Sequence, residues 1–194
     1  AAGKGTRMKS DLPKVCHPIG GRAMVCAVMD ACLEAGVTHL VPVVGYQKQK
    51  VVEAVGSYAT RPGVTLEFAH QDEQHGTGHA VAMARPLFDP MLAQGKDREV
   101  FVLCGDGPLI RARTLRTMLE RHRSTGAAAT LATSVIDDPT GYGRIVRGPR
   151  GRFERIVEHK NATEAQRAIR EVNPSYYVFG ARALFDAVAT LRPN

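Results

Sequence analysis

The sequence predicts an α/β domain with a mixed, mainly parallel sheet and helices on both of its faces. Segments with strand patterns alternate with segments of helical periodicity along most of the chain, as in wound α/β folds. Residues 99–104 form a nearly continuous apolar run, which is typical of a strand covered on both faces. After residue 140, two short strand patterns flank a Gly-Pro turn and indicate some change of strand direction.

The first half of the chain contains three predicted helices and two predicted strands. Apolar residues between Met24 and Leu33 recur at helical spacing, and Gly36 follows as a stop signal. Residues 39–44 have the length and apolar character of a strand, which ends at Gly45. The other predicted elements here are a helix over 47–55, a strand over 64–68 and a helix over 79–87.

The second half continues the alternation and then changes to shorter strands. The apolar run at residues 99–104 leads directly into Gly105-Asp106-Gly107-Pro108. The remaining predicted elements are a helix over 113–123, a buried strand over 127–136, short strands over 144–147 and 153–158, a helix over 163–169, a strand over 172–179 and a helix over 181–191.

Composition and charge restrict the class of protein. The chain has 194 residues, of which 44% are hydrophobic. A domain of this length buries a core large enough that it needs no disulfide or metal cross-links. The net charge of +7 suits anionic ligands such as nucleotides or phosphosugars but does not choose among them. Cys16, Cys26, Cys32 and Cys104 have no metal-site spacing, so we expect reduced thiols in a cytoplasmic protein. No apolar run reaches the ~20 residues that span a bilayer, and we expect neither membrane nor nucleic-acid partners.

The opening residues 1–14 are the first candidate site. Gly3 and Gly5 let the backbone approach a ligand closely, and successive N–H groups in such a turn bind anions. Arg7 and Lys14 add cationic side chains. Two interpretations of this segment remain open: it is a binding site for a polyphosphate, or it is a solvated basic chain end. The spacing excludes both the P-loop and the dinucleotide-binding fingerprint.

Two further loops follow predicted strands, at the edge where parallel sheets bind ligands. Asp106 leaves a buried strand between two glycines, and a single carboxylate facing a polyphosphate commonly holds Mg²⁺. The alternative is an aspartate in an ordinary turn. The loop of residues 71–77 is rich in amides, which can read the edge of a base. His75 and His79 are four residues apart, but the intervening glycines argue against a helix and hence against zinc.

Four sequence blocks resemble motifs of the sugar-nucleotide pyrophosphorylases. Residues 1–8 (AAGKGTRM) with Pro13-Lys14 are similar to the G-x-G-T-R…P-K signature of that superfamily. Residues 73–80 (EQHGTGHA), 137–145 (DDPTGYGRI) and 156–160 (IVEHK) narrow the resemblance. Together they resemble the uridyltransferase domain of the bacterial bifunctional N-acetylglucosamine-1-phosphate uridyltransferases and glucosamine-1-phosphate acetyltransferases, over essentially the whole chain.

The resemblance implies a Rossmann-like nucleotidyltransferase fold and a Mg²⁺-dependent reaction. UTP and N-acetylglucosamine 1-phosphate would give UDP-N-acetylglucosamine, a peptidoglycan precursor, and pyrophosphate, by direct attack of the sugar phosphate on the α-phosphorus. It implies that Arg7 and Lys14 neutralise the phosphates in catalysis and that Asp106 holds Mg²⁺. The implied substrate contacts are Ala1, Ala2, Gly3 and Lys14 for the nucleotide, Gln71, Gly76 and Thr77 for uracil, Cys104, Gly105 and Asp106 at the metal turn, and Gly143, Glu158 and Asn173 for the sugar.

Two positions depart from the family pattern. Cys104 stands where an aromatic is usual, and Asn173-Pro174-Ser175 stands where Asn-Thr-Gly is usual. Pro174 fixes φ and removes an N–H donor, which affects the implied sugar contacts. The alternatives are therefore a related sugar-1-phosphate nucleotidyltransferase with another nucleotide or hexose phosphate, or a nucleotide-binding module without turnover.

We expect residues 1–194 to be a single partial nucleotidyltransferase domain, truncated at both ends. A glycine loop of this kind normally follows a buried strand, so we expect a strand upstream of Ala1. A second Mg²⁺ ligand, an asparagine late in the family's domain, would lie beyond Asn194. The β-helix that carries acetyl transfer in the family is not expected within this chain, and any homo-oligomer would form through parts outside it.

Overall fold

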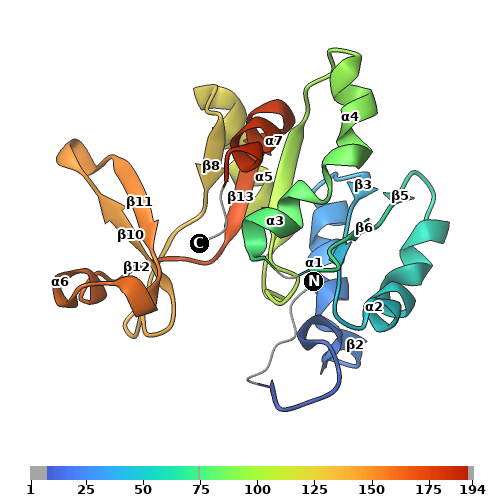
Figure 1. Cartoon of the computed structure of the whole chain (residues 1–194), viewed down its shortest axis with the longest axis horizontal. Coiled ribbons are helices and arrows are strands. Elements are labelled where there is room, and N and C mark those ends of the chain that lie inside the picture. Colours follow the sequence, from blue (N-terminus) through green and yellow to red (C-terminus); the bar gives the residue numbers. More distant parts are fainter. Residues whose placement is uncertain (1–7, 74, 192–194) are drawn as a thin grey trace.

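The chain folds as an α/β domain with a smaller β-rich lobe at its side. The computed structural model describes residues 8–73 and 75–191. In Figure 1, helices flank the strands of the larger part, and the hairpin-containing lobe extends away from it. This arrangement confirms the predicted α/β class, in which sheet strands are covered by helices.

The N-terminal part contains two helices and two parallel strand pairs. Its elements are η2 (Lys14–Cys16), β1 (Pro18–Ile19), β2 (Arg22–Ala23), α1 (Met24–Glu34), β3 (His39–Leu40), β4 (Val43–Val44), α2 (Lys48–Val55), η3 (Gly56–Thr60), β5 (Thr65–Leu66) and β6 (Ala69–His70). β3 pairs with β5 and β4 pairs with β6, in parallel in both cases. The strand predicted at residues 39–44 is interrupted at Val41-Pro42, because proline has no N–H to donate to a ladder.

The larger part is completed by α3 (Thr77–Ala82), α4 (Arg85–Ala93), β7 (Glu99–Leu103), α5 (Ala112–Thr125), β8 (Ala129–Leu131), β13 (Tyr176–Gly180) and α7 (Ala181–Ala189). β13 lies between β7 and β8 and is antiparallel to both. β7 and β8 therefore point the same way, as strands joined through a crossover helix do. Parallel strands are present as predicted, and the insertion of β13 makes the sheet mixed.

The helix predicted over residues 79–87 is two helices. The first, α3, begins at Thr77 and includes Gly78, and the second, α4, begins at Arg85. Pro86 favours the second start, because proline fits the first turn of a helix, and α4 also contains Pro90 in its interior. The expectation that Gly78 would prevent a helix here was wrong, since α3 is supported by packing against α7.

The lobe is formed by β9 (Ser134–Val135), β10 (Gly143–Arg147), η4 (Pro149–Gly151), β11 (Phe153–Val157), η5 (His159–Asn161), α6 (Glu164–Arg167) and β12 (Glu171–Asn173). Its strands follow the order β11-β10-β12-β9, and each pairing is antiparallel. The strand predicted over 127–136 is split between β8 and β9, and that over 172–179 between β12 and β13. An apolar pattern does not reveal that the chain passes from one sheet to another.

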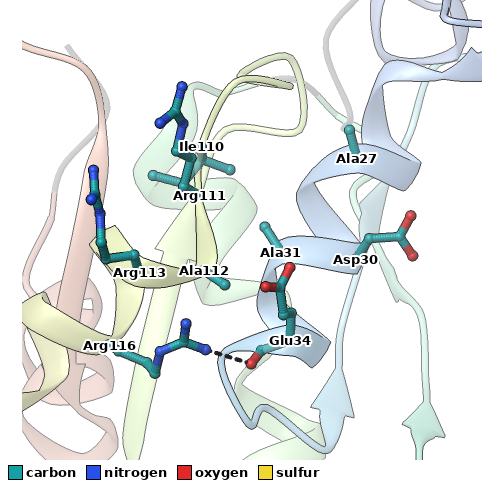
Figure 2. A pocket seen from close by; sticks show the side chains of 9 residues that line it. All are labelled: Ala27, Asp30, Ala31, Glu34, Ile110, Arg111, Ala112, Arg113 and Arg116. Carbon is teal, nitrogen blue, oxygen red and sulfur yellow. Dashed lines mark hydrogen bonds between the residues drawn. The ribbon is translucent and has the colours of Figure 1, made fainter.

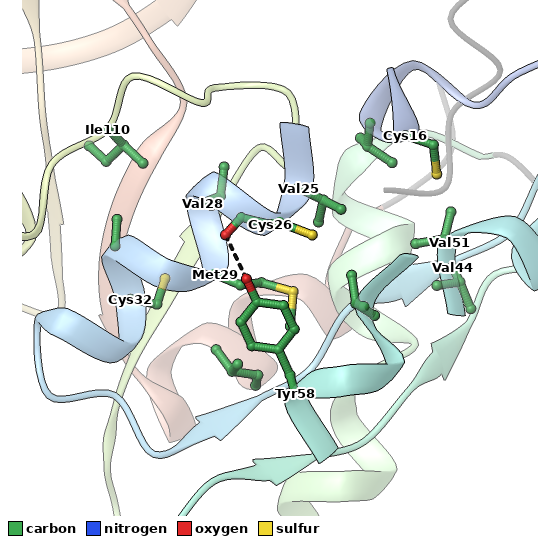
Figure 3. Close-up of a cluster of buried hydrophobic side chains, with 14 of the residues drawn as sticks. Cys16, Val25, Cys26, Val28, Met29, Cys32, Val44, Val51, Tyr58 and Ile110 are labelled. Atoms are coloured by element: carbon green, nitrogen blue, oxygen red, sulfur yellow. Dashed lines mark hydrogen bonds between the residues drawn. The ribbon is translucent and has the colours of Figure 1, made fainter. Parts of the chain in front are cut away.

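The first core surrounds Tyr58, which is fully buried between α1 and α2 (Figure 3). Its hydroxyl lies 2.7 Å from Asp30 Oδ1 and 2.9 Å from the Cys26 carbonyl oxygen, and it accepts a hydrogen bond from Arg22. Burial and the Asp30 carboxylate raise the pKa of Tyr58. Cys26 and Cys32 pack in the same core as free thiols, which confirms their predicted structural role.

We expect Tyr58→Phe to lower the free energy of unfolding by about 1–2 kcal/mol, because buried hydrogen-bond partners lose their donor. Urea denaturation at neutral pH measures the change. Tyr142→Phe, at a half-exposed tyrosine, is the matched control and should leave the midpoint unchanged. An unaltered midpoint in Tyr58→Phe would show that the hydroxyl adds nothing to stability.

The second core joins α7 to α3 and α4. Phe185 is almost fully buried, and its ring centroid lies 5.0 Å from that of Phe88 in a tilted contact. Val81 of α3 packs against this cluster. The longest helix of the described residues, α5, has 14 residues, and no helix among them has the length and apolar character of a membrane span. This core holds α3, and with it the end of the amide-rich loop.

Candidate functional site

The carboxyl end of β7 brings Asp106 against Lys14. Lys14 Nζ donates to Asp106 Oδ2 at 2.5 Å and so joins the end of the N-terminal loop to the turn after β7. The side chains are 44% and 31% exposed, so the pair is partly solvated and contributes little to stability. Asp106 Oδ1 receives no hydrogen bond from the described chain, which leaves one carboxylate oxygen open to a cation.

Glycines on both sides of Asp106 allow the turn to lie against neighbouring elements. A Cβ on Gly105 would lie 3.2 Å from Val15 Cγ1, in η2. A Cβ on Gly107 would lie only 2.4 Å from the hydroxyl oxygen of Tyr176, in β13. The two glycines are therefore needed for close packing, and this packing fixes where the Asp106 backbone lies.

Cys104 adjoins this turn but is unsuited to be a nucleophile. Burial, followed by the Asp106 carboxylate, raises the pKa of the thiol, and a hydrogen bond to Ser175 opposes that rise. The thiol is therefore protonated near neutral pH, whereas reactive cysteines depend on the thiolate.

The amide-rich loop follows β6 and folds back on Gln71. Gln71 is 3% exposed, and its Nε2 lies 3.1 Å from the Gly76 carbonyl oxygen and 3.0 Å from His79 Nδ1. Gly76 has φ +93°, a conformation that favours glycine, and Thr77 starts α3 directly after it. The structure thus brings Gln71, Gly76 and Thr77 together, as the predicted base site requires.

The three residues predicted to bind the sugar also meet, in the lobe. Gly143 of β10 pairs with Asn173 of β12, and Glu158 follows β11 in the same sheet. A Cβ on Gly143 would lie 3.2 Å from Glu158 Oε1 and 2.9 Å from Ile156 Cγ2. A bare backbone at Gly143 therefore lies directly beside the Glu158 carboxylate.

The amide of Asn173 is engaged within its own turn. Its Nδ2 donates to Tyr177 Oη at 2.7 Å and to Ser175 Oγ at 3.4 Å, and its Oδ1 accepts from the Ser175 N–H at 3.0 Å. Ser175 has φ +63°, which is uncommon for a residue other than glycine. The amide group therefore stabilises the turn between β12 and β13, which reduces its capacity to contact a sugar.

Arg144 is a buried cation that the sequence analysis did not single out. It is 1% exposed; it donates to the carbonyl oxygens of Tyr142 and, at 3.4 Å, Arg167, and lies 3.2 Å from His159 Nδ1. Within the described chain its Nε has no hydrogen-bond partner. Arg144 ties the turn before Gly143 to the segment after β11. Four further arginines follow it within eleven residues and are all exposed, so the sequence pattern did not distinguish the buried Arg144 from Arg147, Arg150, Arg152 and Arg155.

A family profile described as nucleotidyl transferase matches residues 1–194. The chain belongs to the nucleotidyl transferase family. This confirms the predicted family resemblance and the enzyme class, nucleotidyltransferase. Two similar relatives are each named bifunctional protein GlmU. The relative from Geobacillus sp. (strain WCH70) is 45% identical, and the match covers 100% of this chain and 40% of the relative. The relative from Geobacter metallireducens (strain GS-15) is 49% identical, and the match covers 98% of this chain and 38% of the relative.

This nucleotidyl transferase spans about 40% of the length of the curated relatives it matches. Solved structures with the same fold include a putative glucose-1-phosphate thymidylyltransferase from Bacillus anthracis, with a TM-score of 0.81 and 19% identity over 100% of this chain and 74% of that one. A UDP-glucose pyrophosphorylase complexed with UDP-glucose has a TM-score of 0.78 and 16% identity, and the match covers 100% of this chain and 78% of that one. At these identities the likeness confirms the fold alone.

A groove of about 580 Å³ lies away from the predicted site of this nucleotidyl transferase, between α1 and the start of α5 (Figure 2). Its walls carry arginines from the α5 side and acids from α1, and Arg116 donates to the Glu34 carbonyl oxygen at 2.7 Å. Its lining residues are Ala27, Asp30, Ala31, Glu34, Ile110, Arg111, Ala112, Arg113 and Arg116. None of the predicted site residues lines this groove.

The last predictions concern the pair His75 and His79 and the residues before Met8. The rings of His75 and His79 lie with their centroids 5.1 Å apart, and the described residues hold no group of three His, Cys, Asp or Glu side chains that could bind a metal ion. Ala1, Ala2, Gly3 and Arg7 lie outside the described residues. Their predicted contacts with the nucleotide therefore stay predictions.

Proposed function

We propose that this nucleotidyl transferase moves a uridylyl group from UTP to N-acetylglucosamine 1-phosphate, in the cytoplasm. The products would be UDP-N-acetylglucosamine, which supplies cell wall synthesis, and pyrophosphate. The observation that carries the proposal is the contact between Lys14 and Asp106 at the end of β7, which assembles a cation and a carboxylate where nucleotides bind in such sheets. Similarity to the GlmU proteins over the whole chain supports it.

The reaction requires positioning and charge neutralisation rather than a covalent enzyme intermediate. A phosphate oxygen of the sugar attacks the α-phosphorus of UTP and forms a new P–O bond. The bond from the α-phosphorus to the oxygen shared with the β-phosphate breaks, and pyrophosphate leaves with the bonding electrons. Lys14, together with Arg7, neutralises the negative charge that grows on the leaving pyrophosphate.

Mg²⁺ is part of the proposal, and the residues at the turn fit it. Mg²⁺ is usually held by one or two carboxylates together with substrate phosphates and waters. Asp106 supplies one such carboxylate, and within the described chain only its Oδ2 accepts a hydrogen bond, from Lys14. When bound, the ion neutralises polyphosphate charge and orients the reacting phosphate.

The remaining predicted residues divide between the two substrates. Gln71 reads uracil beside Gly76 and Thr77, since they meet in one loop at the same end of the sheet. Gly143 and Glu158 bind the hydroxyl or amide groups of the sugar, with the backbone N–H of Gly143 and the Glu158 carboxylate as the contacting groups. Ala1, Ala2 and Gly3 complete the nucleotide contacts in this proposal.

Pyrophosphate release from the full-length gene product tests the proposed function. We expect release only when UTP, N-acetylglucosamine 1-phosphate and Mg²⁺ are all present, and loss of release on chelation with EDTA. Release of phosphate from UTP without a sugar phosphate would contradict the proposal. UTP binding without any turnover would instead identify a nucleotide-binding module.

The turn at Asn173 favours a second candidate, a nucleotidyltransferase for another hexose phosphate. The Asn173 amide is engaged by Ser175 and Tyr177, so one implied sugar contact is weakened. A panel of hexose 1-phosphates, with and without the N-acetyl group, separates the two candidates. Faster turnover of glucose 1-phosphate than of its N-acetylamino counterpart would favour the second.

A further inference from the structure

The neighbours of Gln71 allow its side-chain amide only one orientation, with Nε2 toward Gly76 and His79. Nε2 lies within hydrogen-bonding distance of both the Gly76 carbonyl oxygen and His79 Nδ1. A carbonyl oxygen can only accept, so the NH₂ end of the amide, rather than Oε1, faces Gly76. The backbone therefore fixes which end of Gln71 faces the loop and which end is left for a ligand.

The same contact fixes the proton on the His79 ring. Because Gln71 Nε2 is a donor, His79 Nδ1 must accept, and the ring is the neutral form with its proton on Nε2. Both N–H groups of Gln71 are then used inside the protein. No donor in the described chain reaches Gln71 Oε1, so the buried side chain offers a ligand one acceptor and no donor.

His79 is held by a packed helix. It lies in α3, where the neighbouring Val81 packs into the second core with Phe185 of α7. A Cβ on Gly78 would lie 2.6 Å from Leu191 Cδ1, so this helix is in close contact with the chain after α7. The position of His79 Nδ1 is therefore set by α3 and by the elements that pack against it.

We propose that His79 is a positioning residue that determines base specificity, by engaging the second N–H of Gln71 so that only Oε1 meets the base. This inference rests on the proposed function, in which Gln71 reads uracil. On that edge uracil has a single donor, N3–H, between two carbonyl acceptors, so Oε1 must lie opposite N3. Cytosine has an acceptor at N3, which would face Oε1 and be rejected.

Pyrophosphate release from UTP and from CTP, each as kcat/KM in the full-length gene product, tests this inference. We expect the wild type to prefer UTP and His79→Leu to lower the UTP-to-CTP ratio about tenfold, because an amide held by the Gly76 carbonyl oxygen alone can rotate and turn its other N–H toward cytosine N3. His79→Asn should retain the ratio within about twofold, since the asparagine Oδ1 can replace Nδ1 as acceptor. His75→Leu removes the ring contact to His79 but no hydrogen bond of Gln71, so its ratio should equal that of the wild type.

Nitrogen-15 NMR of the wild type provides a readout that is independent of turnover and of whether His79→Leu folds. The inference expects an unprotonated His79 Nδ1, and a proton found on Nδ1 would overturn it. A wild type that prefers UTP, with an unchanged ratio in His79→Leu, would overturn the inference while leaving the proposed function intact. A wild type that uses neither UTP nor CTP would overturn the proposed function, and this inference with it.

Discussion

Asp106→Asn is expected to lower turnover about a thousandfold and to leave the fold intact, because the charge that would hold Mg²⁺ opposite the polyphosphate is lost. The asparagine keeps the size of the side chain between its two glycines. The lost pair with Lys14 is partly solvated, so the thermal midpoint should change little. Initial rates of pyrophosphate release at saturating substrates and Mg²⁺, together with a thermal melt, measure both effects.

A matched variant separates the local effect from a general loss of charge. Asp89 lies in α4 and forms a surface pair with Arg85, and it is not one of the predicted site residues, so Asp89→Asn should retain full turnover. If Asp106→Asn also retained full turnover, the metal role of this carboxylate would be refuted. Loss of the folded state in Asp106→Asn would assign the residue a structural role instead.

Gly107→Ala is expected to lower kcat/KM about 10- to 100-fold, because a small displacement of a positioned group has effects of this size. The new Cβ would lie 2.4 Å from Tyr176 Oη and 3.2 Å from two ring carbons, so either the turn that carries Asp106 or the Tyr176 ring must shift. The tyrosine belongs to β13, in the middle of a three-stranded sheet, so its backbone is fixed and only its ring can give way. Rates at several Mg²⁺ concentrations measure the loss.

The double variant Gly107→Ala/Tyr176→Phe tests the cause of this loss. Removing the tyrosine hydroxyl relieves the shortest contact, so we expect the double variant to regain part of the lost rate, with a measurable coupling between the sites. Gly148→Ala is a suitable control, since its Cβ would meet only the far end of the Glu154 side chain, at 3.1 Å in the hairpin. A double variant no faster than Gly107→Ala would show that the clash is not the cause.

The sequence was sufficient to predict the alternation of strands and helices because buried stripes and apolar runs are local signals. It did not predict the antiparallel direction of β13, since a strand covered on both faces has no direction in its pattern. It also joined β8 to β9 and β12 to β13, because a change of sheet needs only a bend at Thr133 or Pro174. Such bends depend on tertiary contacts rather than on local pattern.

The candidate site likewise combines features that the sequence predicts with features that depend on tertiary contacts. Lys14, Gln71 and Asp106 were selected from glycine-rich or amide-rich loops, and the structure places Lys14 against Asp106 and Gln71 against Gly76. The burial of Arg144 could not be predicted, since its partners are backbone carbonyls and a histidine that come together only in the folded lobe. The use of the Asn173 amide by its own turn likewise depends on Ser175 adopting a positive φ.

The antiparallel neighbours β8 and β13 have a consequence for how such an enzyme can diversify. The chain leaves the sheet after β8 and returns at β13, and the two ends meet, since the Ala132 N–H donates to the Tyr176 carbonyl oxygen at 3.0 Å. The lobe is therefore an insertion between two adjacent antiparallel strands, in the place of the loop of a hairpin. Its length, and the sugar contacts proposed for it, can change in evolution without altering a single pairing of the sheet that presents Asp106.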